Sequence, residues 1–215
     1  MTCRPCPERR ARGSATVEFV IVAFAVLIPL VFGTVEIALL GVARHTLGLA
    51  TFMAARAGAT AHGDRGAMQR SLARGLAPLY AARGDTQAYA RSLADVLRPD
   101  RTRIEIWNPV ATSFADFGVP DGGGGERIPN VWRRSDTRVG AASRQTIAEA
   151  NQLGVRVGIC RAPSLPITAP LIVAGLRLTD TSPFAQGCYA AGRVPLYSRA
   201  LVHMHSDPQR AALGL

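Results

Sequence analysis

The hydrophobic pattern divides the chain into one long apolar segment and a remainder in which short apolar runs alternate with polar ones. Residues 19–35 form an uncharged run, FVIVAFAVLIPLVFGTV. Counted outward to residues 14–40, the segment would span about 40 Å as a helix, and a bilayer core needs ~20 such residues. Pro29, Gly33 and Glu36 leave no Ala-x-Ala ending. We therefore predict a retained transmembrane helix rather than a cleaved secretory signal.

The helical pattern continues past this apolar run. Leu47, Ala50, Ala54 and Ala57 recur at helical spacing and form a narrow face of mostly small residues, against which another element can pack closely. We expect one continuous helix over residues 14–61, half in the membrane and half outside it. Pro29 removes a backbone donor, so we expect a kink there.

The rest of the chain changes between helical and alternating patterns. The spacing predicts helices over residues 67–82, 86–97 and 146–152, and strands over 102–107, 153–160 and 194–205. Turn residues predict a long loop over 108–144. The apolar stretch 171–178 is too short to span a membrane and is expected to be an edge strand or a hydrophobic surface segment. The predicted fold class is α+β, with a long N-terminal helix and a small antiparallel sheet.

The charges around the span predict its orientation. Four arginines precede it and only Glu8 opposes them, so the leader should remain cytoplasmic and the bulk of the chain should lie outside the inner membrane, in the periplasm. Cys160 and Cys188 agree with that placement, because an oxidising compartment permits a structural disulfide. We expect this bridge, which would stabilise the fold by ~3 kcal/mol in the chain-entropy model.

The junction between the leader and the span is unusual. Glu18 lies at the membrane edge five residues after Gly13, and a carboxylate there is costly unless it has a role. If the chain is cut after Gly13, Ser14 becomes a cationic N-terminus with Glu18 at i+4 on the same helix face. Glu36 follows eighteen residues after Glu18, so an unkinked helix would place both on one stripe. Glu36 is also interpreted as a mark of the outer membrane interface.

The order Gly13, four small or apolar residues, Glu18-Phe19 and an apolar span resembles the class III signal of type IV pilins and pseudopilins. With Pro29, Phe32-Gly33, Glu36 and the small residues 55–58, it resembles more narrowly the TadE-like family, minor pilins of the tight-adherence (Flp) secretion system. The resemblance implies cleavage after Gly13 by a prepilin peptidase and assembly with other pilins or pseudopilins and the Tad machinery. It implies a leader (1–13), a membrane and pilin-like helix (14–61) and an extracytoplasmic domain (62–215).

Other chemistry has weaker support in the sequence. All 25 basic residues are arginine and the net charge is +10, but the arginines are scattered, so no specific nucleic-acid partner is expected. Cys3 and Cys6 lie in the leader, and His203 and His205 lack a convincing third ligand, so no metal site is predicted. Catalytic and phosphate-binding motifs are missing, so we expect no enzyme, cofactor or small-molecule substrate. The alternative to a pilin is an uncleaved, single-span, membrane-anchored periplasmic binding module.

Overall fold

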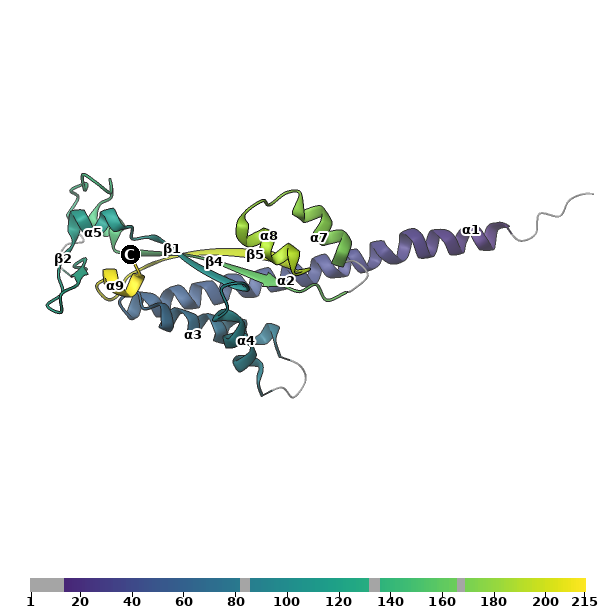
Figure 1. Ribbon diagram of the computed structural model, residues 1–215, viewed down its shortest axis with the longest axis horizontal. Coiled ribbons are helices and arrows are strands. Elements are labelled where there is room, and N and C mark those ends of the chain that lie inside the picture. The colour runs from purple at the N-terminus through teal and green to yellow at the C-terminus, as the bar shows by residue number, and fades with distance from the viewer. Residues whose placement is uncertain (1–13, 82–85, 132–135, 166–168) are drawn as a thin grey trace, which may run out of the picture.

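A long N-terminal helix organises the molecule, and the rest of the chain packs on its second half (Figure 1). The computed structural model describes residues 14–81, 86–131, 136–165 and 169–215. The helix comprises α1 (Ser14–Val22), a π-helical turn η1 (Ala23–Leu27) and α2 (Ile28–Thr60). The predicted continuous helix over residues 14–61 is therefore confirmed to within one residue.

The π turn lies directly before Pro29. Across it, the Ile28 N–H donates to the Ala23 carbonyl, one residue further back than in an α-helix. Proline cannot donate at the following position, so the local change of helix type occurs where the sequence predicts a disturbance. Glu18 and Glu36 were predicted to lie on one stripe if the α-helix between them is unbroken. The π turn η1 lies between the two residues and interrupts the α-helix, so the premise of that prediction does not hold.

Three antiparallel strands form the main sheet: β1 (Thr102–Asn108), β4 (Gln152–Arg161) and β5 (Val194–His203). Their order is β1-β4-β5, and β4, the strand with the most buried residues, lies in the centre. Leu153, Val155 and Val157 are fully buried along it. All three strands were predicted from their apolar patterns.

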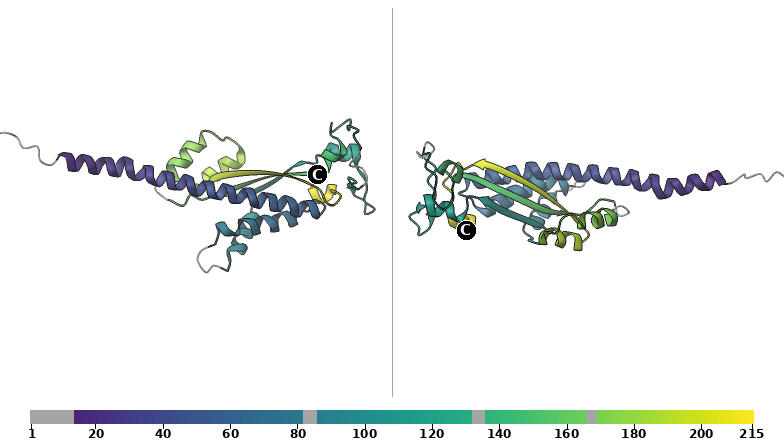
Figure 2. Two further views of the ribbon diagram at one scale, coloured as in Figure 1. Left: turned by 180° about the vertical axis from the view of Figure 1, so that it is seen from behind. Right: turned by 90° about the horizontal axis from the view of Figure 1, so that it is seen from above.

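The sheet and a helical layer enclose the second half of the long helix (Figures 1 and 2). α2 packs against α3 (Arg65–Leu76) and against β4 and β5. At Gly58 these elements meet so closely that an added Cβ would lie 2.8 Å from Met68 and 2.9 Å from Leu153. The helical layer continues through the short 3-10 turn η2 (Ala77–Leu79) into α4 (Ala88–Val96), near the predicted helices.

Two segments differ from the secondary structure expected from the sequence. The predicted loop over residues 108–144 contains α5 (Ala111–Phe117) and the small hairpin β2 (Val119–Pro120) and β3 (Glu126–Arg127). Phe114, 2% exposed, fixes α5 to the core. The segment 171–178, expected as an edge strand or a hydrophobic surface segment, is not a strand but lies in and directly after helix α7 (Ala169–Arg177), whose Ile172, Val173 and Leu176 pack on the core at helical spacing. Its exposed Leu171 and Leu178 agree with the second alternative, a hydrophobic surface segment.

Three further helices complete the described chain. α6 (Ile147–Ala150) lies inside the predicted helix 146–152, and Thr146 and Glu149 form a capping box at its start. α8 (Pro183–Ala190) and α9 (Arg210–Leu213) were not predicted. Together these elements confirm the predicted α+β class with a long N-terminal helix and a small antiparallel sheet.

Candidate functional site

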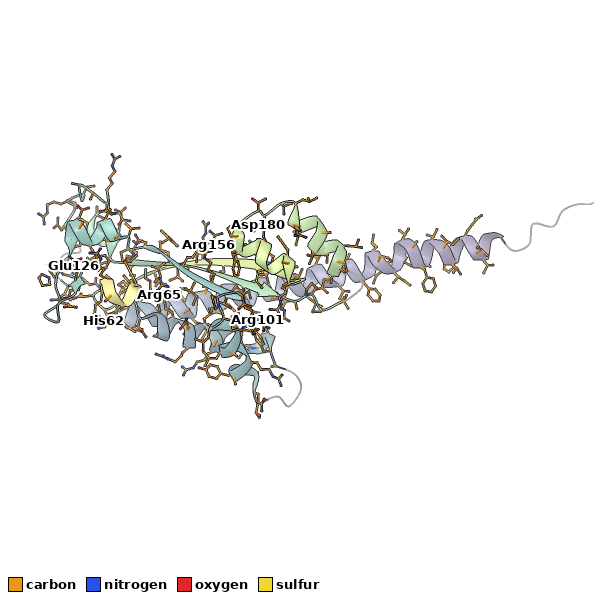
Figure 3. All side chains as sticks on the ribbon, in the orientation of Figure 1. His62, Arg65, Arg101, Glu126, Arg156 and Asp180 are labelled. Atoms are coloured by element: carbon orange, nitrogen blue, oxygen red, sulfur yellow. A yellow bond between two sulfur atoms is a disulfide. The ribbon has the colours of Figure 1, made fainter. Side chains whose placement is uncertain are left out.

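The first half of the long helix carries large apolar side chains that no other described element covers. Phe19 is 70% exposed and Phe24 is 69% exposed, and Figure 3 shows the side chains of α1 projecting away from the rest of the fold. The helical region Thr16–Thr60 has a window of mean hydropathy 2.5 of which only 6% is buried. A core helix of a soluble protein would be covered, so this segment fits a single-pass membrane anchor.

One of the two residues predicted for processing lies at the beginning of this helix. Gly13 lies outside the described residues, and Ser14 is the first residue of α1. Glu18 and Phe19 are exposed on the same helix, one turn further along. Both side chains therefore lie on the exposed N-terminal part of the long helix.

Glu36 is buried at the point where the bare half of the helix ends. Its carboxylate is 1% exposed. One oxygen, Oε1, accepts the Ser164 N–H at 2.9 Å, and the other, Oε2, accepts the Leu165 N–H at 2.8 Å. These partners lie more than 120 residues further along the chain, with a separation of 128 for Ser164. Glu36 thus fastens the segment after β4 to the helix, a contact that the sequence did not indicate.

A disulfide lies next to this attachment. Cys160, near the end of β4, is bonded to Cys188 in α8, with 5.4 Å between their Cα atoms. The adjacent Arg161 donates from Nη1 to the Leu79 carbonyl at 3.2 Å. The corner of the domain on the side of α1 is therefore held by a covalent bond and by hydrogen bonds to both α2 and η2.

The second half of the helix presents two different faces. On the covered face, Leu47, Ala50 and Ala54 are fully buried, as their spacing predicted, whereas Ala57 of the same predicted face is half-buried. α3 approaches so closely that a Cβ added at Gly75 would lie 2.6 Å from the Ala50 Cβ. On the outward face, large apolar residues remain between 45% and 61% exposed: Val42, Leu49, Phe52 and Met53. This outward face extends the apolar surface of α1 beyond the membrane segment.

A basic groove lies between α2 and the edge strand β5. It has a volume of about 730 Å³, and its lining includes three arginines, Arg44, Arg156 and Arg199, together with His45. Arg156, labelled in Figure 3, lies over the Tyr197 ring at 5.0 Å from its centroid. Arg156 also reaches Glu105 at 3.8 Å. The scattered arginines of the sequence therefore include three that converge here, which their spacing did not reveal.

The two histidines singled out in the sequence lie at the far end of β5. Both His203 and His205 are exposed. Within the described residues, no group of three or more histidine, cysteine, aspartate or glutamate side chains could hold a metal ion. The His205 N–H instead donates to the Ala59 carbonyl at 2.9 Å, where it helps to close the end of α2.

Comparison with known proteins gives one match. Residues 13–56 match the family model described as TadE-like protein, which confirms the resemblance seen in the sequence. The match covers the bare half of the helix and most of its covered half, and it relates the chain to Tad pilus components, which are structural proteins. No curated protein and no solved structure matches the chain.

Proposed function

We propose that this protein is a minor pilin or pseudopilin of a Tad (Flp) pilus or secretion apparatus. In this proposal a prepilin peptidase cuts after Gly13 and removes residues 1–13. Residues 14–61 then serve as the membrane and assembly helix, and residues 62–215 form a periplasmic domain. The protein is first a single-pass protein of the inner membrane with a cytoplasmic N-terminus, and it acts by assembly rather than by catalysis.

The observation that carries this proposal is the division of the long helix. Its first half displays large apolar residues to the surroundings, and Glu18 is the only charged residue between Thr16 and Val35. The family match begins at Gly13, the residue after which the cut is proposed. A helix that is only an anchor has no need for a carboxylate at this depth, since burying one in a bilayer is unfavourable.

Glu18 acts in this proposal through the new N-terminus. Cleavage creates a positively charged amine on Ser14, one helical turn before Glu18. The two charges neutralise each other, within one subunit or between neighbours, which lowers the free-energy cost of keeping both in an apolar environment. Other pilins or pseudopilins pack against the apolar residues of α1 and the outward face of α2.

The first experiment determines the N-terminus of the mature protein purified from membranes, with and without the host prepilin peptidase. We expect a start at Ser14 that depends on the peptidase. Gly13→Leu should block this processing, because a bulky residue replaces the small one at the cut. An unchanged Met1 in both strains would contradict the proposal.

A second experiment tests the role of Glu18. Glu18→Ala should insert into the membrane and fold as the wild type does, because Glu18 lies outside the packed domain. Piliation should nevertheless be impaired, as counted by electron microscopy of shed filaments. The matched control is Glu126→Ala, which removes an exposed carboxylate of the distal hairpin. Normal piliation by Glu18→Ala would remove the proposed role.

The basic groove favours one second candidate, an uncleaved membrane-anchored binding module. Three arginines that converge between α2 and β5 suit an acidic polymer or envelope partner. The N-terminal experiment separates the two functions, since an anchored module keeps Met1. A module would also lose its ligand when Arg44 and Arg199 are replaced by glutamine, while its membrane insertion stayed intact.

A further inference from the structure

Helix α7 has an apolar face that the described protein leaves open. Leu171 is 70% exposed, and Leu178, directly after the helix, is 85% exposed. Ala174 and Gly175 lie between them at helical spacing and are also exposed. The opposite face of the helix packs on the core. Helix α7 is thus apolar on both sides, and one side has no protein cover among the described residues.

The beginning of α7 is fixed to the long helix by a chain of hydrogen bonds. The Ala169 N–H donates to the Leu165 carbonyl at 3.2 Å. The Leu165 N–H in turn donates to Glu36 Oε2 at 2.8 Å. Glu36 is the first charged residue after Glu18 on the long helix and, among the described residues, its first buried one, although exposed apolar residues continue past it at Ile37 and Leu39. These hydrogen bonds therefore place the beginning of α7 beside Glu36 along the axis of the long helix.

The figures agree with this placement. In both side views, α7 lies at the end of the domain that faces α1 (Figures 1 and 2). The disulfide between Cys160 and Cys188 holds the neighbouring α8, against which α7 packs. The disulfide and the Glu36 hydrogen bonds therefore both hold the part of the domain that carries the exposed Leu171 and Leu178.

The depth of the membrane follows from helix length. The twenty residues from 16 to 35 would span about 30 Å, the thickness of a bilayer hydrocarbon core. Glu36 then lies at the boundary between hydrocarbon and headgroups, and α7 begins beside it. At this level, the apolar face of α7 next to the span would contact lipid rather than bulk water.

We propose that α7 lies on the bilayer that the long helix spans, with Leu171 and Leu178 inserted among the lipids of the leaflet on the domain side. The inference rests on the proposed membrane span. Arg177, the basic residue at the end of α7, is exposed and extends to the lipid phosphates. The domain is thereby attached to the membrane at two points, the spanning helix and α7, which limits its tilt and rotation.

The test uses the full-length chain in lipid nanodiscs with single spin labels. Cys3→Ser and Cys6→Ser remove the leader thiols, while the disulfide is kept under non-reducing conditions. Labels are placed by Leu171→Cys and Leu178→Cys. The controls are Val26→Cys on the bare helix and Leu201→Cys on β5, which are 57% and 50% exposed. Power saturation then compares collisions with oxygen, which is enriched in lipid, and with a water-soluble nickel chelate.

The expected result is that labels at 171 and 178 favour oxygen, as at 26, whereas the label at 201 favours the chelate. If 171 and 178 behave like 201 while 26 reports lipid, the proposal for α7 is overturned and the membrane span stands. If 26 also reports water, the span itself fails. Labels at 171 and 178 that are shielded from both reagents would show a protein partner in place of lipid, which likewise overturns the proposal.

Discussion

The two halves of the long helix differ in polarity and in surroundings, since residues 19–35 carry no charge whereas the second half includes Arg44, His45 and Arg56. Over residues 16–35 the side chains are exposed or half-buried, and the helix has large residues such as Phe19 and Phe24. Over residues 43–59 the face toward the domain is buried and consists mainly of alanine. The buried face of the second half therefore differs from the first half in residue size as well as in hydropathy. Small residues allow another helix to approach, whereas bulky ones present a wide apolar surface to lipid or to a neighbouring helix.

Glu36 marks the change from one half to the other. On its N-terminal side the described structure provides no buried helix residue, and on its C-terminal side the covered face begins at Ala43. Its carboxylate joins the helix to the domain through backbone N–H groups rather than through another side chain. One helix thus combines a half that fits a lipid environment with a half that is packed by the domain, and the buried Glu36 lies near the boundary between them.

The largest expected effect comes from making the same substitution in both halves. Ala50→Leu should destabilise the fold by about 1–3 kcal/mol or more, because the backbone of α3 at Gly75 leaves no room for a larger side chain. Ala25→Leu should cost little, since Ala25 is exposed. Thermal unfolding of the full chain in mild detergent, followed by circular dichroism, measures the difference. Equal effects of the two changes would break the distinction between the halves.

A smaller effect is expected at the boundary. Glu36→Leu leaves the Ser164 and Leu165 N–H groups without their acceptor, and an unsatisfied buried donor costs ~1–3 kcal/mol. Hydrogen exchange at these two amides should accelerate, while exchange in β4 should change much less. Glu36→Gln keeps one acceptor oxygen and should give an intermediate result. Unaltered exchange in Glu36→Leu would show that the carboxylate does not hold this segment.

The smallest expected effect on stability concerns Tyr80, which follows η2 in the helical layer that packs on the second half of the long helix. Burial, followed by the nearby charge of Asp95 and a hydrogen bond to it, raises the pKa of Tyr80 to about 12 from 10.0. Between about pH 10 and pH 12, the folded state thus keeps the Tyr80 hydroxyl proton, whereas the unfolded state loses it. The stabilisation is complete below about pH 10 and is lost as the pH rises through about 12.

Tyr80→Phe tests this alkaline dependence. The variant should lose less stability than the wild type between pH 10 and pH 12, and urea unfolding at several pH values measures the difference. Tyr80→Phe also removes the 3.0 Å hydrogen bond to Asp95, so it should be slightly less stable at pH 7. Parallel pH profiles for both proteins would argue against a titration at Tyr80.

The sequence predicted the elements whose pattern is local. The continuous helix, the three strands of the main sheet and the buried face at Leu47, Ala50 and Ala54 follow from periodicity alone. Helix α7 was missed because its short apolar run fits a strand or a helix equally well, and only packing on the core decides. Helix α5 was missed because residues rich in turn signals surround it.

The contacts of the candidate functional site were harder to predict from local sequence patterns than the secondary structure was. The apolar span and the TadE-like junction could be recognised in the sequence, and the family match supports them. The partners of Glu36 could not, because the contact joins residues separated by 128 positions and uses backbone N–H groups of unremarkable residues. The groove of Arg44, Arg156 and Arg199 likewise depends on how α2 meets the sheet. Contacts between distant segments carry no local pattern.

The closure of α2 has a consequence for the order in which the protein can be made. The Ala59 carbonyl at the end of this helix accepts the N–H groups of His205 and Ser206, and the Ser206 hydroxyl accepts the His62 N–H from 144 residues away. β5, which covers the helix, also comes late in the chain. The helix is synthesised first, α3 follows it directly, and β5 completes the cover last. A chain that stalls before β5 would therefore expose the part of the helix face that β5 covers in the finished protein.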